Sequence, residues 1–205
     1  FLNSHIAESL VLNYFWNHPE GTFRSLKWQV QEQGVNWQPF VWSGGPLINY
    51  ENQNNQLVFA LQSQQPSNAE VYSSLISVGP NKTYLVSYQV KTEKLGGTGQ
   101  YPGAVIASEY NSNAKETDKL TDNRLHDGKR SNIPVFQGTN SWQNISYQFT
   151  TNANTKYVRL RALNAGWGTS TGKVWFQKIK IIHLLQLHHS QIPMPCKLLL
   201  KKPGY

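Results

Sequence analysis

Several features that would point to common protein classes are missing from this sequence. Cys196 is the only cysteine, so an internal disulfide framework is excluded. No apolar run reaches the roughly 18 residues that a membrane-spanning helix needs. Charged residues make up only 15% of the chain, whereas aromatic residues reach 12%. Asn, Gln, Ser and Thr fill the difference, and such a surface suits neutral, hydroxyl-rich partners.

Charge gives little support for nucleic-acid binding. The formal net charge is +8, but the lysines and arginines are spread along the chain without a long basic run. The last 23 residues add three lysines and no acid. We interpret the charge as a moderately basic, solvated surface, and we predict no nucleic-acid partner.

Helical periodicity is also lacking, because no segment of ten or more residues before residue 182 keeps a clean 3.6-residue repeat. Alternation with period two replaces it. In "TYLVSYQVKTE", Tyr84, Val86, Tyr88 and Val90 point to one side of the expected strand. The segments "NQLVFALQ", "NISYQFTT" and "KYVRLRAL" alternate in the same way, and Gly-, Pro- and Asn-rich turns separate them. The pattern predicts an all-β chain folded as a β-sandwich or jelly roll of two antiparallel sheets.

Two regions fall outside this pattern. Residues 111–140 are polar and poor in strand signals, which predicts a long loop with a short helical turn. Residues 183–205 form a sharp change in composition, with "IPMPCKLLLKKPGY" spaced like an extended arm. We therefore expect a domain at 1–182 and a tail at 183–205 that acts as a linker or as an arm for a protein partner. His188, His189 and Cys196 give only a poor signal for metal binding.

Four segments in order resemble a known family. They are "LVLNYFW…KWQV", "VGPNKTYLVSYQVKTE", "NSWQNISYQFTTNANTKYVRLRAL" and the closing "GKVWFQKIKI". This order is similar to that of β-sandwich carbohydrate-binding modules of families 4, 9, 16 and 22, over roughly residues 9–182. The resemblance implies a jelly roll, no catalysis, and a saccharide cleft on the concave sheet or at its loop edge.

The same resemblance also implies a structural calcium, which many members hold through an acidic pair in the final strand. Gln177 and Lys178 stand at the positions of that pair. An amide oxygen can ligate calcium, but an ammonium group repels it. We therefore expect this calcium site to be lost or rebuilt, and we predict no cofactor and no metal ligand.

Aromatic residues in loops are the main candidates for saccharide binding, since flat rings stack on the apolar C–H faces of sugars. Trp37 and Trp42 lie in "VNWQPFVWSGGP", close to Tyr50, while Trp167 stands between two glycines and Tyr101 lies in "GGTGQYPG". Binding and structural roles remain open for each. By contrast, Trp28, Trp142 and Trp175 lie in expected strands, and we predict that they pack in the core.

Polar residues on the outer side of two expected strands complete the candidate site. Ser87, Gln89 and Lys91 lie on one strand, and Arg159 and Arg161 project from another. If the two strands share the concave sheet, they form a polar, cationic floor that favours acidic glycans or phosphorylated wall polymers. The alternative is a solvated face without a binding role.

Catalytic motifs are absent: there is no G-x-S-x-G, no P-loop and no H-E-x-x-H sequence. His126 and Asp127 could be drawn as an acid–base pair, but neighbouring residues on a strand point apart. We predict that the protein is not an enzyme.

Three functional hypotheses follow. The first is a non-catalytic module that attaches a larger, extracellular or surface-exposed protein to polysaccharide or cell-wall glycan. The second is an accessory subunit of a bacterial surface or phage-tail assembly that recognises a host. The third is a jelly-roll polysaccharide-degrading enzyme. Both binding hypotheses predict that deletion of 183–205 leaves glycan binding intact. No membrane insertion is expected in any of the three.

Overall fold

The computed structural model describes residues 26–30, 35–53, 56–127 and 133–186. The chain divides into two compact units, residues 30–183 and residues 1–29 with 184–205. The fold described below is that of the first unit. Most of the tail predicted at 183–205, including the candidate metal ligands, lies outside the described residues, and so does the side chain of Trp28. The described part contains strands and turns, and none of its segments is a helix able to cross a membrane.

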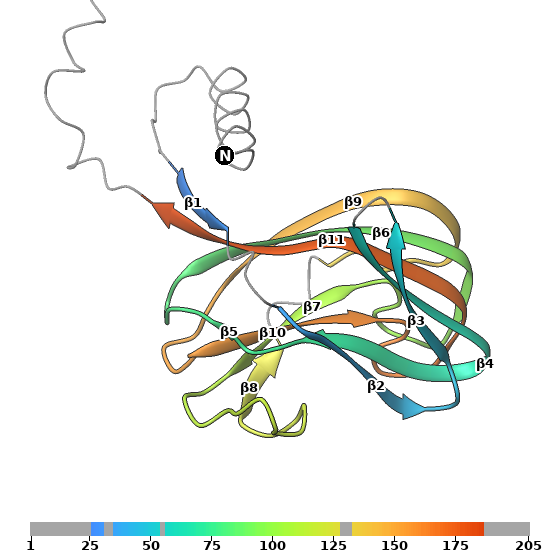
Figure 1. Cartoon of the computed structure of the whole chain (residues 1–205), viewed down its shortest axis with the longest axis horizontal. Coiled ribbons are helices and arrows are strands. Elements are labelled where there is room, and N and C mark those ends of the chain that lie inside the picture. Colours follow the sequence, from blue (N-terminus) through green and yellow to red (C-terminus); the bar gives the residue numbers. More distant parts are fainter. Residues whose placement is uncertain (1–25, 31–34, 54–55, 128–132, 187–205) are drawn as a thin grey trace, which may run out of the picture. The chain divides into compact units, whose positions relative to one another are not determined.

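Eleven strands make up the described secondary structure (Figure 1). They are β1 (Leu26–Val30), β2 (Trp37–Ser43), β3 (Leu47–Gln53), β4 (Gln56–Ser73), β5 (Ile76–Ser77), β6 (Thr83–Gly97), β7 (Val105–Tyr110), β8 (Arg124–Asp127), β9 (Gly138–Thr150), β10 (Tyr157–Leu163) and β11 (Ser170–Gln186). Each strand expected from sequence alternation appears among them.

The strands form two antiparallel layers, and the unit is a jelly-roll β-sandwich (Figure 1). Sheet A has the order β3-β4-β11-β6-β9. Sheet B has the order β2-β4-β10-β7-β8, with the short β5 also paired to β10. This confirms the fold class predicted from the sequence.

Strand β4 belongs to both sheets. Its first half, residues 56–63, pairs with β3 and β11 in sheet A. Its second half, residues 68–73, pairs with β2 and β10 in sheet B. A strand that passes from one layer to the other makes a corner of the sandwich, and it brings β2 and β10 together around residues 68–72.

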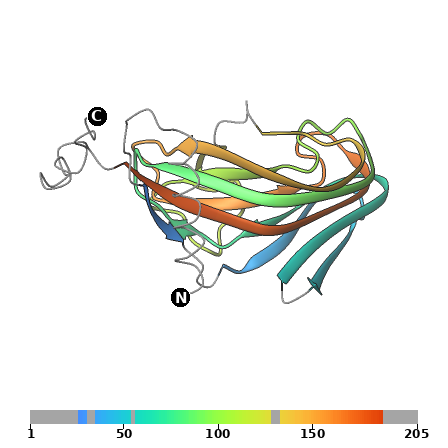
Figure 2. The ribbon, with the colours of Figure 1, turned by 90° about the horizontal axis from the view of Figure 1, so that it is seen from above.

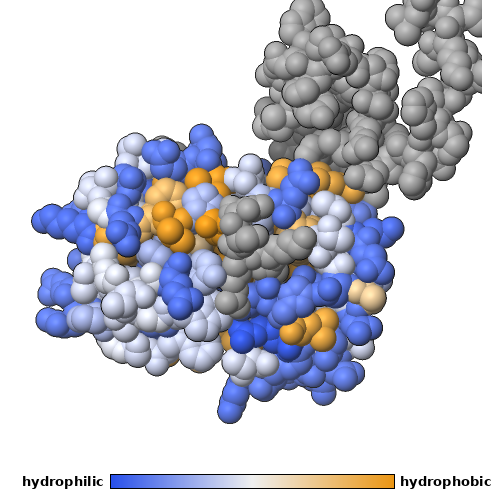
Figure 3. Space-filling model, turned by 180° about the vertical axis from the view of Figure 1, so that it is seen from behind, coloured by the Kyte–Doolittle hydropathy of each residue, from blue (hydrophilic) through white to orange (hydrophobic). Residues whose placement is uncertain are grey.

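The core lies between the sheets and follows the period-two pattern. From sheet A, Phe59, Val86, Tyr88 and Phe176 point inward, and from sheet B, Leu160 meets them. All five side chains are almost completely buried. Burial of one such side chain contributes about 1.5–3 kcal/mol, so this alternation stabilises the sandwich. The face drawn in Figure 3 is mainly hydrophilic, with separate hydrophobic patches.

The segment 111–140 departs from its prediction. Residues 112–122 form successive turns and no helical turn, and residues 124–127 form strand β8 at the edge of sheet B. The sequence did not predict strand β8, because its four residues are too few to show a period-two pattern. The Tyr110 hydroxyl donates to the Leu120 carbonyl at 2.8 Å and fastens these turns to the sheet.

The closing strand β11 contains an irregularity at the polar pair Gln177 and Lys178. Its register with β6 shifts between Gln177 and Lys180, and Lys178 has a φ of 53°. A left-handed residue in a strand marks a bulge. Lys178 is exposed there, while Gln177 stays in the ladder opposite Gln89.

Candidate glycan-binding cavity over sheet B

A cavity of about 270 Å³ lies over the outer face of sheet B, where β2, β4 and β10 meet the loop that follows β10. Residues from five segments of the chain line it. They are Trp42, Asn68, Thr121, Arg124, Arg161, Leu163, Gly166 and Trp167. Three of them, Trp42, Arg161 and Trp167, are candidates from the sequence.

Trp42 forms one wall from strand β2. A register shift between Val41 and Ser43 releases β2 from regular pairing with β4 and lets Trp42 stand out from the sheet. The indole ring is 44% exposed, and the edge of Phe40 meets it at a centroid distance of 4.6 Å. Its Nε1–H donates to Glu70 Oε1 at 3.1 Å. The polar edge of the ring is therefore fixed, and a flat apolar face remains exposed.

Trp167 forms another wall from a loop of unusual backbone. Gly166, Trp167 and Gly168 have consecutive φ values of 52°, 50° and 103°. A Cβ atom on Gly168 would lie 2.5 Å from the Thr98 carbonyl oxygen, so only glycine fits there. Trp167 itself accepts a left-handed conformation that is rare for a bulky residue. The result is a side chain 38% exposed at the cavity, with Tyr101 packed edge-on at 5.8 Å.

The floor is a buried ion network centred on Arg161, which is 3% exposed. Its Nη2 lies 2.7 Å from Glu70 Oε2, its Nε donates to the same oxygen at 2.8 Å, and its Nη1 lies 3.1 Å from Asp127 Oδ1. Burial raises the pKa of the Glu70 carboxyl, while the guanidinium and the Trp42 N–H favour its charged form. Arg124 Nη1 also lies 3.6 Å from Asp127 Oδ1, so two arginines face two carboxylates and the floor favours a neutral ligand.

Asn68 offers an unused hydrogen-bonding atom at this cavity. Within the described residues its side-chain Oδ1 is buried and has no hydrogen-bond partner. Such an acceptor costs about 1–3 kcal/mol unless something donates to it. Asn68 lines the cavity wall, and a turn of its side chain would bring Oδ1 to a ligand hydroxyl.

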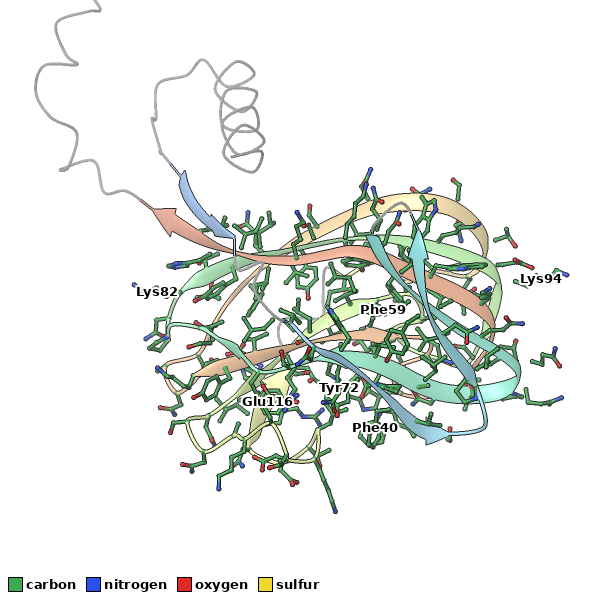
Figure 4. All side chains as sticks on the ribbon, viewed as in Figure 1. Phe40, Phe59, Tyr72, Lys82, Lys94 and Glu116 are labelled. Carbon is green, nitrogen blue, oxygen red and sulfur yellow. The ribbon has the colours of Figure 1, made fainter. Side chains whose placement is uncertain are left out.

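Arg159, the other arginine predicted on this face, is placed differently. It is 2% exposed, because the turns after β7 cover it. Its guanidinium lies 3.2 Å from Glu116 and donates to the Ser73 carbonyl at 3.0 Å and to the Lys115 carbonyl at 3.3 Å. Its position is structural: it fastens the turns to the sheet. Figure 4 shows Glu116, Tyr72 and Phe40 on the same side of the sandwich, with Phe59 between the layers.

The remaining sequence candidates do not line the cavity. Trp37 packs against the core, with its ring centroid 4.8 Å from that of Phe59. Tyr50 is exposed, and its ring meets Phe59 edge-on at 5.4 Å. Tyr101 packs edge-on against the Trp167 ring, at a centroid distance of 5.8 Å. Gln89 lies on β6 in the other sheet.

The expectation of a shared polar floor is wrong. Gln89 belongs to β6 in sheet A, whereas Arg159 and Arg161 belong to β10 in sheet B. Both strands direct polar residues away from the core, and the two sheets expose opposite sides of the sandwich. Alternation shows which side chains leave the core, but it cannot show which sheet carries the strand.

Sequence reasoning missed several residues of the site. Glu70 and Asn68 come from the second half of β4, where they alternate with the core residues Ala69 and Val71 as on any outer strand face. Phe40 shares a face with Trp42, a relation that their spacing of two in "FVW" could have indicated. Thr121 and Arg124 belong to the turns and edge strand that were expected to be a loop.

Two other predicted features can be compared with the geometry. Lys178 is exposed on its bulge, and Gln177 Nε2 donates to Gln89 Oε1 at 2.7 Å. The loss of a calcium site at this pair stays a prediction. Among the described residues no group of three His, Cys, Asp or Glu side chains gathers in metal-binding geometry. The His126 side chain lies 3.3 Å from Glu109, whereas the Asp127 carboxylate contacts Arg161 and Ser108. The side chains of His126 and Asp127 therefore interact with different residues.

Comparisons with known proteins concern the fold. No family model and no curated protein matches the sequence. Among solved structures, a family 11 carbohydrate-binding module from Clostridium thermocellum, in complex with a β-1,3-1,4-mixed-linked tetrasaccharide, is 12% identical, with a TM-score of 0.48, and the match covers 82% of this chain and 100% of that one. The CBM22-1 xylan-binding domain of Paenibacillus barcinonensis Xyn10C is 11% identical, with a TM-score of 0.43 and coverage of 82% and 99%.

A third similar structure is the enzymatically active domain of bacteriophage CBA120 tailspike protein 4. It is 8% identical, with a TM-score of 0.44, and the match covers 75% of this chain but only 20% of that one. Modules of families 4 and 16 are also similar. Carbohydrate-binding modules, the family that the sequence motifs resemble, are among the solved structures similar to this chain.

Proposed function

We propose that this protein is a non-catalytic glycan-binding module and that the cavity over sheet B holds a saccharide. One observation carries the proposal: Trp42 and Trp167, from distant parts of the chain, present half-exposed rings to the same cavity. Stacking on two aromatic rings suits the apolar faces of a sugar. The order of the sequence motifs, which resembles that of carbohydrate-binding modules, favours the same class of ligand.

The polar groups of the cavity complement the rings. Asn68 has an unpaired acceptor that a hydroxyl can reach once the side chain turns. Arg161 and Arg124 together balance Glu70 and Asp127, which favours an uncharged sugar over an acidic one. A volume of about 270 Å³ lies just below the range of pockets for drug-sized ligands, which suits one or two sugar rings of a longer chain.

The role of the module is to attach a larger protein or assembly to polysaccharide or cell-wall glycan, outside the cell or on a surface. Catalysis is not part of the proposal, because the carboxylates at the cavity, Glu70 and Asp127, are both engaged by Arg161. A carboxylate held by a guanidinium in this way is a poor general acid.

A glycan array that includes bacterial wall polysaccharides tests the proposal. We expect binding of a neutral glycan that Trp42→Ala or Trp167→Ala weakens about 10- to 100-fold, the effect of losing one stacked ring. Tyr50→Ala is the matched control, since Tyr50 is equally exposed and lies outside the cavity. Binding unaffected by either tryptophan variant would exclude the cavity as the site.

Two further arms complete the experiment. Binding should persist in EDTA, because the cavity relies on rings and hydrogen bonds within the protein. The release of reducing ends measures hydrolysis of the bound glycan, and we expect no more release than in a blank without protein. Turnover lost in Glu70→Gln would instead indicate an enzyme.

A further inference from the structure

The outer face of sheet A carries an aromatic residue that the main core does not use. Trp175 is 8% exposed, yet it packs with Val58 and Ala60 in a small cluster apart from the core between the sheets. Its neighbour Phe176 points inward, so alternation directs Trp175 outward. Trp142 of β9 packs against the same cluster. Figure 2 looks onto this side, where β9, β6 and β11 run side by side.

Two lysines converge on the Trp175 ring from different strands. Lys91 Nζ of β6 lies 4.7 Å from the ring centroid, and Lys173 Nζ of β11 lies 4.4 Å from it. Cation–π attraction holds each ammonium group. The two ammonium groups lie no more than about 9 Å apart, the sum of these two distances, so their like charges repel each other.

No carboxylate in the described part of the chain compensates these lysines with an ion pair. Glu93 stands opposite Lys173 across the β6–β11 ladder, but the ion pairs of the described residues do not include it. On sheet B, by contrast, Arg161 faces two carboxylates. An external anion between Lys91 and Lys173 would relieve their repulsion.

A row of amides crosses the same face one step along the strands. Gln177 Nε2 donates to Gln89 Oε1 at 2.7 Å, and Gln89 Nε2 donates to Asn144 Oδ1 at 2.7 Å. The row therefore links β11, β6 and β9. It lies two residues, roughly 7 Å, from the Trp175–Lys91 pair in the register of the sheet. Amides suit hydroxyl groups, and the lysines suit an acid.

We propose that this face, defined by Lys91, Lys173, Trp175, Gln89 and Asn144, is a second binding site for a carboxylated polysaccharide such as a polyuronate. The ligand lays a carboxylate between the two ammonium groups and its ring hydroxyls along the amide row. Hydroxyls beside a single acid match a polymer with one charge per sugar ring. The site is independent of the neutral cavity over sheet B, since the two lie on opposite sides of the sandwich.

Affinity electrophoresis and calorimetry with polygalacturonate, and with dextran as the neutral polymer, test the proposal. The double variant Lys91→Gln, Lys173→Gln keeps side-chain length near that of lysine and removes both charges. We expect it to weaken polygalacturonate binding on the order of ten-fold. Lys82→Gln, Lys156→Gln is the matched control, because it removes the same charge at exposed sites elsewhere. Thermal melting checks that both variants fold.

The outcomes separate this site from the cavity. Trp42→Ala should leave polygalacturonate binding unchanged, and the double lysine variant should leave neutral glycan binding unchanged. The proposal is overturned if wild type does not bind polygalacturonate, or if the control variant loses as much affinity as the test variant. It is also overturned if single-stranded DNA binds equally well and with the same dependence on Lys91 and Lys173.

Discussion

The two outer faces of the sandwich differ in whether their aromatic rings are exposed and in whether their charged side chains are paired. Over sheet B, Arg161 is buried, Arg161 and Arg124 together balance Glu70 and Asp127, and Trp42 and Trp167 are exposed. Over sheet A, the ring of Trp175 is buried, and the lysines above it have no carboxylate partner in the described part of the chain. One face thus offers rings to a ligand, and the other offers charge.

The largest expected effect tests the buried charge of sheet B. Arg161→Met leaves Glu70 and Asp127 without their shared partner, and removing one member of a buried ion network costs about 3–5 kcal/mol. Urea denaturation measures the change in the free energy of unfolding. Lys173→Met on sheet A is the control, and we expect it to cost no more than about 1 kcal/mol, the value of a partly exposed cation–π contact. Equal losses would remove the contrast between the faces.

A second effect concerns the loop that presents Trp167. Gly168→Ala places a Cβ against the Thr98 carbonyl at a φ of 103°, and such strain costs on the order of 1–3 kcal/mol. Neutral glycan binding should weaken as well, because Trp167 shifts. Gly45→Ala, at a site with open space, should change neither the stability nor the binding. An unchanged melting temperature for Gly168→Ala would contradict the strained loop.

A third effect is alkaline destabilisation of the sheet B layer. Burial raises the pKa of Tyr110 from 10.0 to about 12. A raised pKa contributes stability that is complete below pH 10 and is lost as the pH rises through about 12, at up to about 1.4 kcal/mol per pH unit. Urea denaturation between pH 9 and pH 12 should show a shallower decline for Tyr110→Phe than for wild type. Parallel curves would show that Tyr110 does not titrate in this range.

The smallest effect tests the amide row on sheet A. Asn144 is exposed, so Asn144→Ala should change the free energy of unfolding by less than about 0.5 kcal/mol. Its effect on polygalacturonate binding should nevertheless be measurable, at a few-fold, because one hydrogen-bonding end of the row is lost. Asn154→Ala, the same substitution in an exposed turn, is the control. A large loss of stability for Asn144→Ala would indicate a structural rather than a binding role.

The site could be predicted only in part, and particular residues show why. Trp42 and Trp167 stood out because they lie near glycines and prolines, where a large ring has little core to fill. Glu70 and Asn68 gave no such signal, since they alternate with the core residues Ala69 and Val71, a pattern typical of any strand with a solvated outer face. Trp175 was expected in the core, and it is buried, but in a separate cluster on the other face of sheet A.

The sequence by itself determined the all-β class, most of the strands and the side chains that fill the space between the sheets. Period-two alternation is a local property, and each strand carries it independently of its partners. Only the tertiary structure decided which strands share a sheet, so that Arg161 meets Trp42 and Trp167 while Gln89 meets Gln177. The pairing of β4 with both β11 and β10 is a long-range choice that no local pattern encodes, and that pairing separates the two faces.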